Sequence, residues 1–429
     1  KISQIAREMT RSGEKVISLS SGEPDFDTPK HIKDQAIKAI NDGFTKYTQV
    51  DGTPELKKSI ITKFESENDL KYDLDQITVG VGGKHVIYNL FMSTLNKNDE
   101  VIIPSPYWVS YPDMVNLAGG KPIILETEMK DNFKIIPKQL EANISEKTKW
   151  FIINSPGNPT GTVYDKSELK EISKVLLKNP HVNILSDDIY EHITYGTKFY
   201  NVLNVEPKLY ENTFIVNGVS KAFSMTGWRI GYGAGKKEFI KAISKIQSQS
   251  TTNPCSISQV AAKHALQSEK DFLHDWLKKF ESRKNLLIDF FESISGLDPF
   301  IPSGAFYLYV SCEGFQTDVS NYFANARVCV LPSSKQEGSP TTVLEAMSYG
   351  VPIVAYNIDG LPELVRHEQD GLLVPVADKK QFTNSIIKLL TETQLAKKMS
   401  ASSLARYKAE FQINTCVMKH QDVFKLVKK

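Results

Sequence analysis

The chain has 429 residues, of which 41% are hydrophobic and 24% are charged, a composition typical of globular proteins. Its 52 basic and 50 acidic residues leave a formal net charge of +2, so charge gives no reason to expect a nucleic-acid or membrane-surface partner. The sequence lacks an apolar run near the roughly 20 residues of a membrane span, and its four scattered cysteines match no zinc or disulfide pattern, so we expect a cytoplasmic protein without a metal site.

Short apolar runs alternate with helix-period segments over the first part of the chain. Residues 34–40 place Ala36, Ile37 and Ile40 on one helical face, and the turn at 41–43 ends that helix. Buried strands are predicted at residues 101–103, 150–153, 182–185 and 214–216, and a helix is predicted at 167–177. This alternation predicts an α/β domain with a largely parallel sheet, in which ligands gather beyond the strand ends.

The later part of the chain continues this pattern and then starts a second one. Residues 271–293 predict a long amphipathic helix, and residues 300–310 predict a strand after a turn. A second α/β rhythm starts near residue 316, with strands at 328–331 and 352–355 and helices at 340–349 and 381–392. The two parts meet near residues 313–318 without a low-complexity linker.

Residues 220–229 carry the most informative chemistry. Lys221 follows the predicted strand at 214–216, the hydroxyl of Ser220 stands beside it, and Arg229 comes eight residues later. A lysine amine can form a Schiff base with an aldehyde cofactor, and a cation with hydroxyl groups can bind the phosphate of that cofactor. The stretch therefore predicts pyridoxal 5'-phosphate (PLP) as the cofactor.

Further motifs stand in chain order at residues 21–26, 82–84, 106–108, 154–161 and 187–190, together with the stretch at 220–229. With these motifs, residues 1–312 resemble the class I aminotransferases of PLP fold type I, of the bacterial aspartate and prephenate type. The resemblance implies a large PLP-binding domain at about residues 30–285, with a mostly parallel sheet covered by helices on both faces. It also implies an incomplete small domain formed by about residues 1–29 and 286–312.

The resemblance assigns catalytic roles to three residues. Lys221 would form the Schiff base and carry a proton between the substrate Cα and the cofactor. Asp187 would pair with the pyridine nitrogen, and Tyr190 would hydrogen-bond the phenolic oxygen. Further implied cofactor contacts are Trp108 on the ring, Asn158 at the phenolic oxygen, Gly83, Lys84, Ser220 and Arg229 at the phosphate, and Tyr47 at the phosphate of a neighbouring subunit. Implied substrate contacts are Gly22, Trp108 and Asn158, and Lys84 is a candidate for the distal carboxylate of a dicarboxylic substrate.

The implied partners are an amino acid of the aspartate or glutamate type, a 2-oxo acid and a second copy of the chain, since Tyr47 would complete a shared site. The family carries an arginine for the substrate α-carboxylate beyond the strand that includes Tyr307. Arg327 and Arg366 do not stand in that motif. Losing one partner of a buried charge pair costs about 2–5 kcal/mol, so we expect impaired turnover.

Residues 313–429 resemble the back half of the donor-binding lobe of a GT-B family 4 glycosyltransferase, a partial Rossmann-like α/β lobe. The motifs lie at residues 337–347, 350–355, 360–365 and 370–375. By this resemblance Glu337 would bind the donor sugar and Glu345 the ribose. Two alternatives to transamination therefore stay open: a nucleotide-sugar-binding or glycosyltransferase-related protein, and a non-functional fusion of two truncated enzymes.

Overall fold

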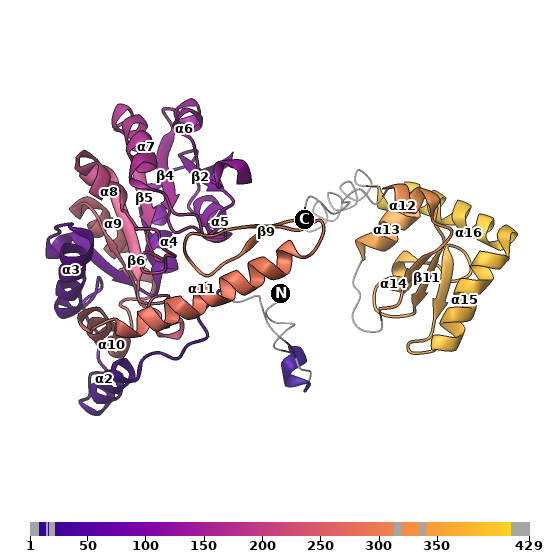
Figure 1. Cartoon of the computed structure of the whole chain (residues 1–429), viewed down its shortest axis with the longest axis horizontal. Helices are drawn as coiled ribbons and strands as arrows, with labels where there is room; N and C mark the ends of the chain where they lie inside the picture. The colour runs from indigo at the N-terminus through magenta and orange to yellow at the C-terminus, as the bar shows by residue number, and fades with distance from the viewer. Residues whose placement is uncertain (1–7, 14–15, 17–21, 313–319, 334–339, 413–429) are drawn as a thin grey trace, which may run out of the picture. The chain divides into compact units, whose positions relative to one another are not determined.

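The computed structural model describes residues 8–13, 16, 22–312, 320–333 and 340–412 (Figure 1). The chain divides into two compact units, Lys1–Gly314 and Phe315–Lys429. The sequence placed this boundary after residue 312.

A seven-stranded sheet in the order β1-β7-β6-β5-β4-β2-β3 forms the centre of the first unit. Its strands are β1 (Ile77–Gly80), β2 (Glu100–Ser105), β3 (Lys121–Glu126), β4 (Thr148–Asn154), β5 (Asn183–Asp187), β6 (Thr213–Gly218) and β7 (Gly231–Ala234). Strand β7 runs antiparallel to β1 and β6, and the other neighbours are parallel. The four predicted apolar runs fall in β2, β4, β5 and β6, the central parallel strands.

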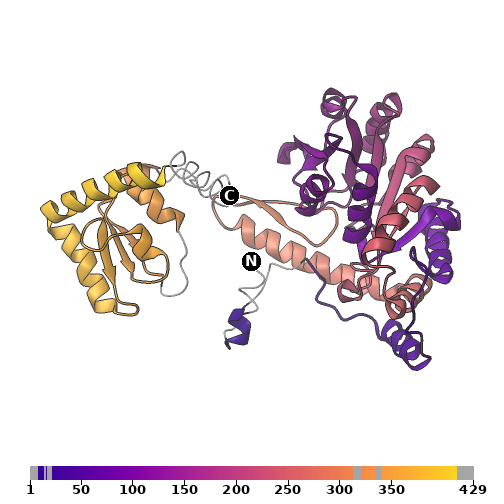
Figure 2. The ribbon, with the colours of Figure 1, turned by 180° about the vertical axis from the view of Figure 1, so that it is seen from behind.

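Helices cover both faces of this sheet (Figures 1 and 2). One face packs against α4 (Gly83–Thr94), α5 (Ser110–Leu117) and α9 (Lys237–Ser250). The other packs against α2 (Lys30–Asn41), α3 (Pro54–Asn68), α6 (Pro137–Asn143), α7 (Lys166–Lys178), α8 (Val202–Val205) and α10 (Ser256–Gln267).

The strand β4 shows why continuous apolar runs in the sequence predict strands that helices cover on both faces. Trp150 and Ile152 belong to the cluster with α4, α5 and α9, whereas Phe151 and Ile153 belong to the opposite cluster. Successive side chains of a strand point to opposite faces, so a strand covered on both sides needs a continuous apolar run. The predicted mostly parallel sheet with helices on both faces is confirmed.

The segment after the long helix α11 (Asp271–Glu292) differs from the prediction of one strand at residues 300–310. Only its ends pair, as β8 (Asp298–Phe300) against β9 (Tyr309–Ser311). Between them the N–H groups of Ser303 and Gly304 both donate to the Gly161 carbonyl, at 3.0 and 2.8 Å. The Ala305 N–H donates to the Ile193 carbonyl at 2.8 Å. These bonds tie the segment to the loops of the large sheet, and the expectation of a continuous strand was wrong.

The second unit is a smaller α/β lobe, as predicted. Its parallel sheet has the order β10 (Cys329–Leu331), β11 (Ile353–Tyr356) and β12 (Gly371–Val374). Its helices are α12 (Ser320–Asn325), α13 (Thr341–Ser348), α14 (Leu361–Leu364), α15 (Lys379–Thr391) and α16 (Thr393–Arg406). The buried carboxylate of Asp370, just before β12, accepts hydrogen bonds from Arg366 at 2.8 Å, Ser402 at 2.8 Å and Arg406 at 3.3 Å. It thereby joins the start of β12 to α16.

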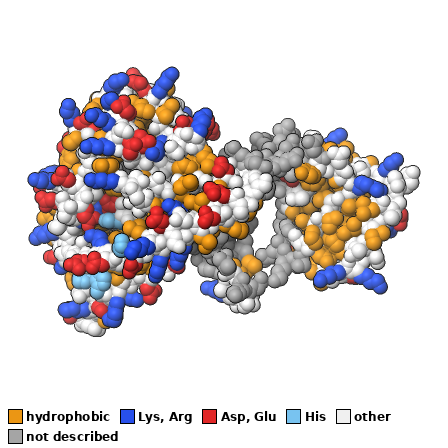
Figure 3. Space-filling view, in the orientation of Figure 1, with side chains coloured by type: hydrophobic (Ala, Val, Ile, Leu, Met, Phe, Trp, Pro, Cys, Tyr) orange, Lys and Arg blue, Asp and Glu red, His pale blue; other side chains and the backbone are white. Residues whose placement is uncertain are grey.

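Charged side chains of both signs are interspersed over the visible face of the first unit (Figure 3). This distribution agrees with the formal net charge of +2. Within the described ranges, no helix has both the length and the apolar character needed to cross a bilayer. Cys255, Cys312 and Cys329 are free cysteines.

Candidate functional site

A cavity of about 520 Å³ opens beyond the carboxyl ends of β4, β5 and β6. This volume lies within the roughly 300–1,000 Å³ that small-molecule and cofactor sites occupy. Its lining brings together most of the predicted site residues: Gly22, Gly83, Lys84, Trp108, Asn158, Asp187, Tyr190, Ser220, Lys221 and Arg229. The topology explains this convergence, because neighbouring parallel strands end at the same edge of the sheet.

Lys221 reaches the cavity from the turn that follows β6. Its Nζ donates to the Gly22 carbonyl at 2.5 Å and lies 5.8 Å from the centroid of the Tyr190 ring. Burial lowers the pKa of Lys221 to about 8; the Glu23 carboxylate opposes this shift and the Arg229 guanidinium adds to it. A lysine with a pKa near 8 is partly neutral at physiological pH, and the neutral amine is the nucleophilic form.

Asp187 is the last residue of β5 and is 5% exposed. Its carboxylate accepts a hydrogen bond from the Tyr111 hydroxyl at 2.6 Å. Burial raises the pKa of Asp187 to about 6, and the bond from Tyr111 offsets part of that shift. Among the described residues no cationic group forms an ion pair with Asp187. A buried carboxylate in this state is a ready partner for a positively charged ring nitrogen.

A tyrosine and amide cluster lies beside Asp187. The hydroxyls of Tyr190 and Tyr307 are 2.5 Å apart, and the Asn158 side-chain amide donates to the Tyr307 hydroxyl at 3.2 Å. Asn154 joins this cluster to the strand end, since it accepts from the Asn158 N–H at 2.8 Å and donates to the Asp187 carbonyl at 2.9 Å. Burial raises the pKa of Tyr190 well above its usual range, so its hydroxyl keeps its proton.

The start of α4 forms the opposite end of the cavity. Helix α4 begins at Gly83 without a side-chain cap, and the N–H groups of Gly83 and Lys84 have no acceptor among the described residues. Arg229 lies close by: a Cβ built on Gly82, whose φ is +87°, would come within 2.2 Å of the guanidinium. Free N–H groups at a helix start and an adjacent guanidinium suit a phosphate.

Trp108 and Lys84 line the cavity together. The Lys84 ammonium group lies 4.9 Å from the centroid of the Trp108 ring. Trp108 also makes an edge-to-face contact with Tyr111, with ring centroids 5.3 Å apart. Gly22 completes the lining, and a Cβ there would meet the Tyr307 hydroxyl at 2.7 Å, so a larger residue would displace that hydroxyl.

Three predicted site residues do not line this cavity. Tyr47 is 88% exposed on the first unit. Glu345 lies on α13 of the second unit with an exposed side chain. Glu337 falls outside the described residues.

The cavity residues that were not predicted include Tyr111, Tyr307 and Asn154. Asn154 opens the motif at 154–161, and Tyr111 follows the motif at 106–108 by three residues. Their positions in the sequence could have suggested them, but only the fold shows that Tyr111 and Tyr307 turn toward Asp187 and Tyr190.

The groups present fit PLP end to end. An amine of lowered pKa, an unpaired buried carboxylate, a hydrogen-bonding tyrosine and uncapped helix N–H groups with a guanidinium line one cavity. In that order, these groups would suit the aldehyde, the ring nitrogen, the phenolic oxygen and the phosphate of the cofactor.

Two family models match the chain. "Aminotransferase class I and II" matches residues 14–340, and "Glycosyl transferases group 1" matches residues 305–392.

Relatives and solved structures resemble the chain over most of its length. A probable aspartate/prephenate aminotransferase of Rickettsia bellii is 56% identical over 307 residues, which are 71% of this chain and 77% of the relative. The one of Rickettsia typhi is 51% identical over 357 residues, 82% of this chain and 87% of the relative. The aspartate aminotransferase of Rhizobium meliloti superposes with a TM-score of 0.71 at 48% identity, covering 73% of this chain and 78% of that structure. The Thermus thermophilus aspartate aminotransferase with maleate gives 0.69 at 41% identity, covering 72% and 80%.

Proposed function

The chain belongs to the class I and II aminotransferase family of PLP-dependent transferases, and on this premise we propose that it transfers an amino group from an amino acid of the aspartate or glutamate type to a 2-oxo acid. The observation that carries the proposal is the pairing, in one cavity, of the Lys221 amine of lowered pKa with the buried, unpaired carboxylate of Asp187. The relatives named for aspartate and prephenate support an acidic donor.

When bound, PLP supplies an electron sink that stabilises negative charge at the substrate Cα. Lys221 is the residue of this chain that can take and return the Cα proton, since its pKa of about 8 lies close to working pH. Asp187 would keep a ring nitrogen protonated, and Tyr111 orients the carboxylate through its hydroxyl. Tyr190 would donate its retained proton to the phenolic oxygen, while Gly83, Lys84, Ser220 and Arg229 would hold the phosphate.

Lys84 supplies a cation of the cavity that suits the distal carboxylate of a substrate. Lys84 is exposed and lies over Trp108, which supports a dicarboxylic substrate. Arg327 and Arg366 are engaged in the second unit, with the Leu390 carbonyl at 2.5 Å and with Asp370 at 2.8 Å. We therefore keep the proposal that the arginine for the α-carboxylate is absent. A missing charge partner costs about 2–5 kcal/mol, which corresponds to roughly 30-fold to several-thousand-fold in turnover or affinity.

The proposed enzyme is a homodimer in which Tyr47 reaches the phosphate bound by the other copy. Tyr47 is 88% exposed and Val109, beside the cavity residue Trp108, is 75% exposed. Large side chains this exposed support a surface that a second copy covers. Free Cys255, Cys312 and Cys329 support a reducing cytoplasmic location.

The test is spectroscopic. Purified protein with PLP should show the absorbance band of lysine-bound cofactor, and aspartate should convert it to the band of the aminated cofactor. Lys221→Ala should abolish both, whereas Lys174→Ala, an exposed lysine paired with Glu171 on α7, should leave both unchanged. No lysine-bound band in the parent protein at saturating PLP would contradict the proposed function.

A second candidate function follows from the glycosyltransferase match at residues 305–392, which includes Glu345. Titration calorimetry with several nucleotide sugars should give a heat of binding if the second unit binds a sugar donor. No heat of binding with any of them would exclude this function.

The two family matches overlap at residues 305–340, which supports a fusion of two truncated enzymes. Long sequencing reads across codons 305–325 test that origin, since a frame interrupted there would make the join an assembly error.

A further inference from the structure

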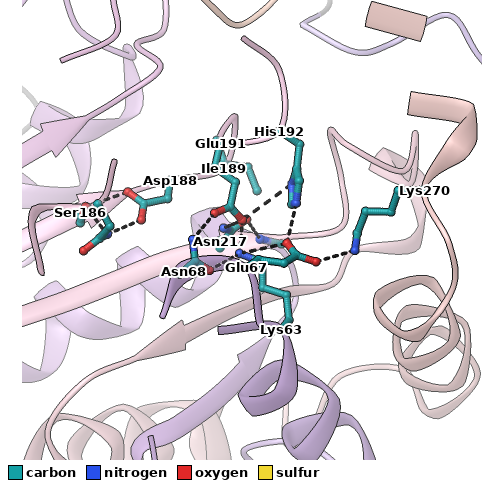
Figure 4. Close-up of polar contacts among 12 residues, drawn as sticks. Lys63, Glu67, Asn68, Ser186, Asp188, Ile189, Glu191, His192, Asn217 and Lys270 are labelled. Carbon is teal, nitrogen blue, oxygen red and sulfur yellow. Dashed lines mark hydrogen bonds and ion pairs between the residues drawn. The ribbon is translucent and has the colours of Figure 1, made fainter. Parts of the chain in front are cut away.

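Asp187 ends β5 and Tyr190 lies in the turn that follows it, and a buried polar network continues from the next residue, Glu191 (Figure 4). The side chain of Glu191 is 4% exposed. Its carboxylate contacts the ammonium group of Lys63, whose side chain on α3 is fully buried. It also accepts hydrogen bonds from the side-chain amides of Asn68 at 2.7 Å and Asn217 at 2.6 Å. Glu191 is thus held by a cation and two amides that come from α3 and β6.

A metal ion is not the natural explanation of this cluster. Ligand atoms of Glu67, Glu191 and His192 lie within 4.8 Å of one another. However, Glu67 already contacts the Lys270 ammonium at 2.5 Å and the His192 ring at 2.7 Å, and Glu191 already contacts Lys63. Burial alone would raise the pKa of Glu67, but His192, Lys63 and Lys270 lower it to about 2. The described charges therefore balance one another, and the cluster has a structural partner for each acid.

Asn217 gives the network its connection to the cavity. It stands in β6, and its side-chain oxygen accepts the N–H of Gly218 at 2.7 Å. The chain then runs through Ser220 to Lys221. Strands β5 and β6 pair directly up to the Asp188 N–H, which donates to the Val216 carbonyl at 2.9 Å. Beyond that point, Glu191 and Asn217 form the side-chain hydrogen bond that joins the two turns within the described part of the chain.

We propose that Glu191 is a positioning residue whose bond to Asn217, fixed by the buried Lys63, holds the turn of Asp187 and Tyr190 in register with the turn of Lys221. The inference rests on the proposed function, because it concerns the alignment of that same site. An amide that donates to a charged carboxylate makes a bond roughly twice as strong as one to a neutral acceptor, and its planar geometry fixes direction as well as distance. Lys63 holds the carboxylate in place, so displacement of either turn must break this bond.

The structure offers a matched pair of variants. Asn217→Ala and Asn68→Ala each remove one buried amide from the same carboxylate. Each also removes one acceptor, for the Gly218 N–H in Asn217→Ala and for the Lys63 ammonium in Asn68→Ala, but only Asn217 connects the carboxylate to Lys221. The first readout is the pH dependence of acetic anhydride labelling of Lys221 in cofactor-free protein, followed by mass spectrometry. The second is kcat and KM for aspartate in the PLP-loaded enzyme.

For Asn217→Ala we expect looser burial of Lys221, so that the labelling midpoint moves up from the parent value near pH 8 and kcat falls about tenfold with KM little changed. Asn68→Ala should lose comparable thermal stability and keep both the labelling midpoint and kcat. Equal effects of the two variants on the midpoint, or no effect of Asn217→Ala, would overturn the proposal. A parent protein that binds no PLP would defeat the proposed function alone, because the labelling readout does not need the cofactor.

An isosteric variant keeps the proposal testable if Asn217→Ala does not fold. Asn217→Asp keeps the shape of the side chain and an oxygen for the Gly218 N–H, but it removes the donor and sets two carboxylates against each other. The Lys221 labelling midpoint should move up in Asn217→Asp as in Asn217→Ala. An unchanged midpoint in the folded Asn217→Asp variant would overturn the positioning role.

Discussion

Asp187 in the first unit and Asp370 in the second are both buried carboxylates at the end or start of a parallel strand, with 5% and 0% exposure. Asp370 accepts from two guanidinium groups and a hydroxyl, and although burial alone would raise its pKa, these donors lower it to about 2. Asp187 accepts a side-chain bond from the Tyr111 hydroxyl, and burial raises its pKa to about 6. The same buried group is therefore satisfied in one unit and left short of a cation in the other.

This contrast separates a structural acid from a functional one. A buried carboxylate with its full set of donors strengthens the fold, whereas one that lacks a cation lowers stability and gains from binding a positively charged ligand. Asp187 faces a cavity and Asp370 lies between β12 and α16. The comparison predicts that removing each charge will have opposite consequences for activity and stability.

The largest expected effect is on turnover in Asp187→Asn. The substitution keeps the shape of the side chain but removes the charge that would hold a ring nitrogen protonated, so we expect kcat to fall by about 10²–10³-fold. Steady-state kinetics with aspartate and a 2-oxo acid would measure it. The matched Asp370→Asn variant should retain the parent kcat, and a similar loss in both would break the distinction between the two acids.

The pH dependence of stability gives the next effect. The pKa of Asp187 is raised from 3.8 to about 6 in the folded chain, so the folded state binds a proton more tightly than the unfolded state between these values. The free energy of unfolding contributed by Asp187 therefore falls as pH rises from about 4 to 6, by about 3 kcal/mol. Urea unfolding of cofactor-free protein should show Asp187→Asn gaining stability over the parent across this range. A constant difference between pH 4 and 7 would contradict the raised pKa.

Asp370→Asn should act in the opposite sense and on the second unit. It removes one of the two carboxylates that contact Arg406, whose side chain is 11% exposed and which keeps Glu410 at 3.3 Å, and Arg366 can partly return to water because it is 42% exposed. We expect a loss of about 2 kcal/mol in the unfolding of this unit. Limited proteolysis followed by mass spectrometry would locate the change. The absorbance of bound PLP should not move, since the Asp370 bonds lie within the second unit.

Much of the fold, and the identity of Asp187 as a site residue, could be predicted from the sequence, because local apolar runs and motifs indicate them. Apolar runs in β2, β4, β5 and β6 are visible because both faces of those strands are buried. Two separate motifs, at residues 187–190 and 220–229, supply Asp187 and Lys221. The edge and antiparallel strands β1, β3 and β7 were not predicted. Strand β7 is half glycine and gives no apolar run. Strand β3 does contain an apolar run at residues 123–125, although most of its residues are part-exposed or exposed.

Contacts between distant segments were the part that could not be predicted. Residues 300–310 have a strand-like composition, yet bonds to Gly161 and Ile193 hold their middle against other loops. Tyr111 and Glu191 look like any surface tyrosine or acid in the sequence, because nothing in their neighbours shows that Asp187 and Lys63 will meet them. The motif at 187–190 marks Asp187 as a cofactor acid, but only the fold shows that Arg366, Ser402 and Arg406 satisfy Asp370.

Tyr111→Phe gives the smallest expected effect and sharpens the comparison most directly. It removes the hydroxyl that offsets the burial of Asp187, so the pKa of Asp187 should rise further above about 6. A single hydrogen bond is worth about 1 kcal/mol, which corresponds to roughly half to one pH unit. PLP affinity should fall on the acid side as Asp187 takes up a proton, because a neutral Asp187 cannot pair with the ring nitrogen. The pH midpoint of this fall, measured by fluorescence titration between pH 5 and 8, should rise by that amount. Tyr72→Phe is the control, since the hydroxyl of that buried tyrosine has no hydrogen-bond partner among the residues that the structure describes, and Tyr72 does not line the cavity. If the pH at which PLP affinity falls is unchanged in Tyr111→Phe, a group other than the Tyr111 hydroxyl must keep Asp187 ionised. Asp187 would then resemble Asp370, whose charge is stabilised by several donors, more closely than its hydrogen bonds indicate.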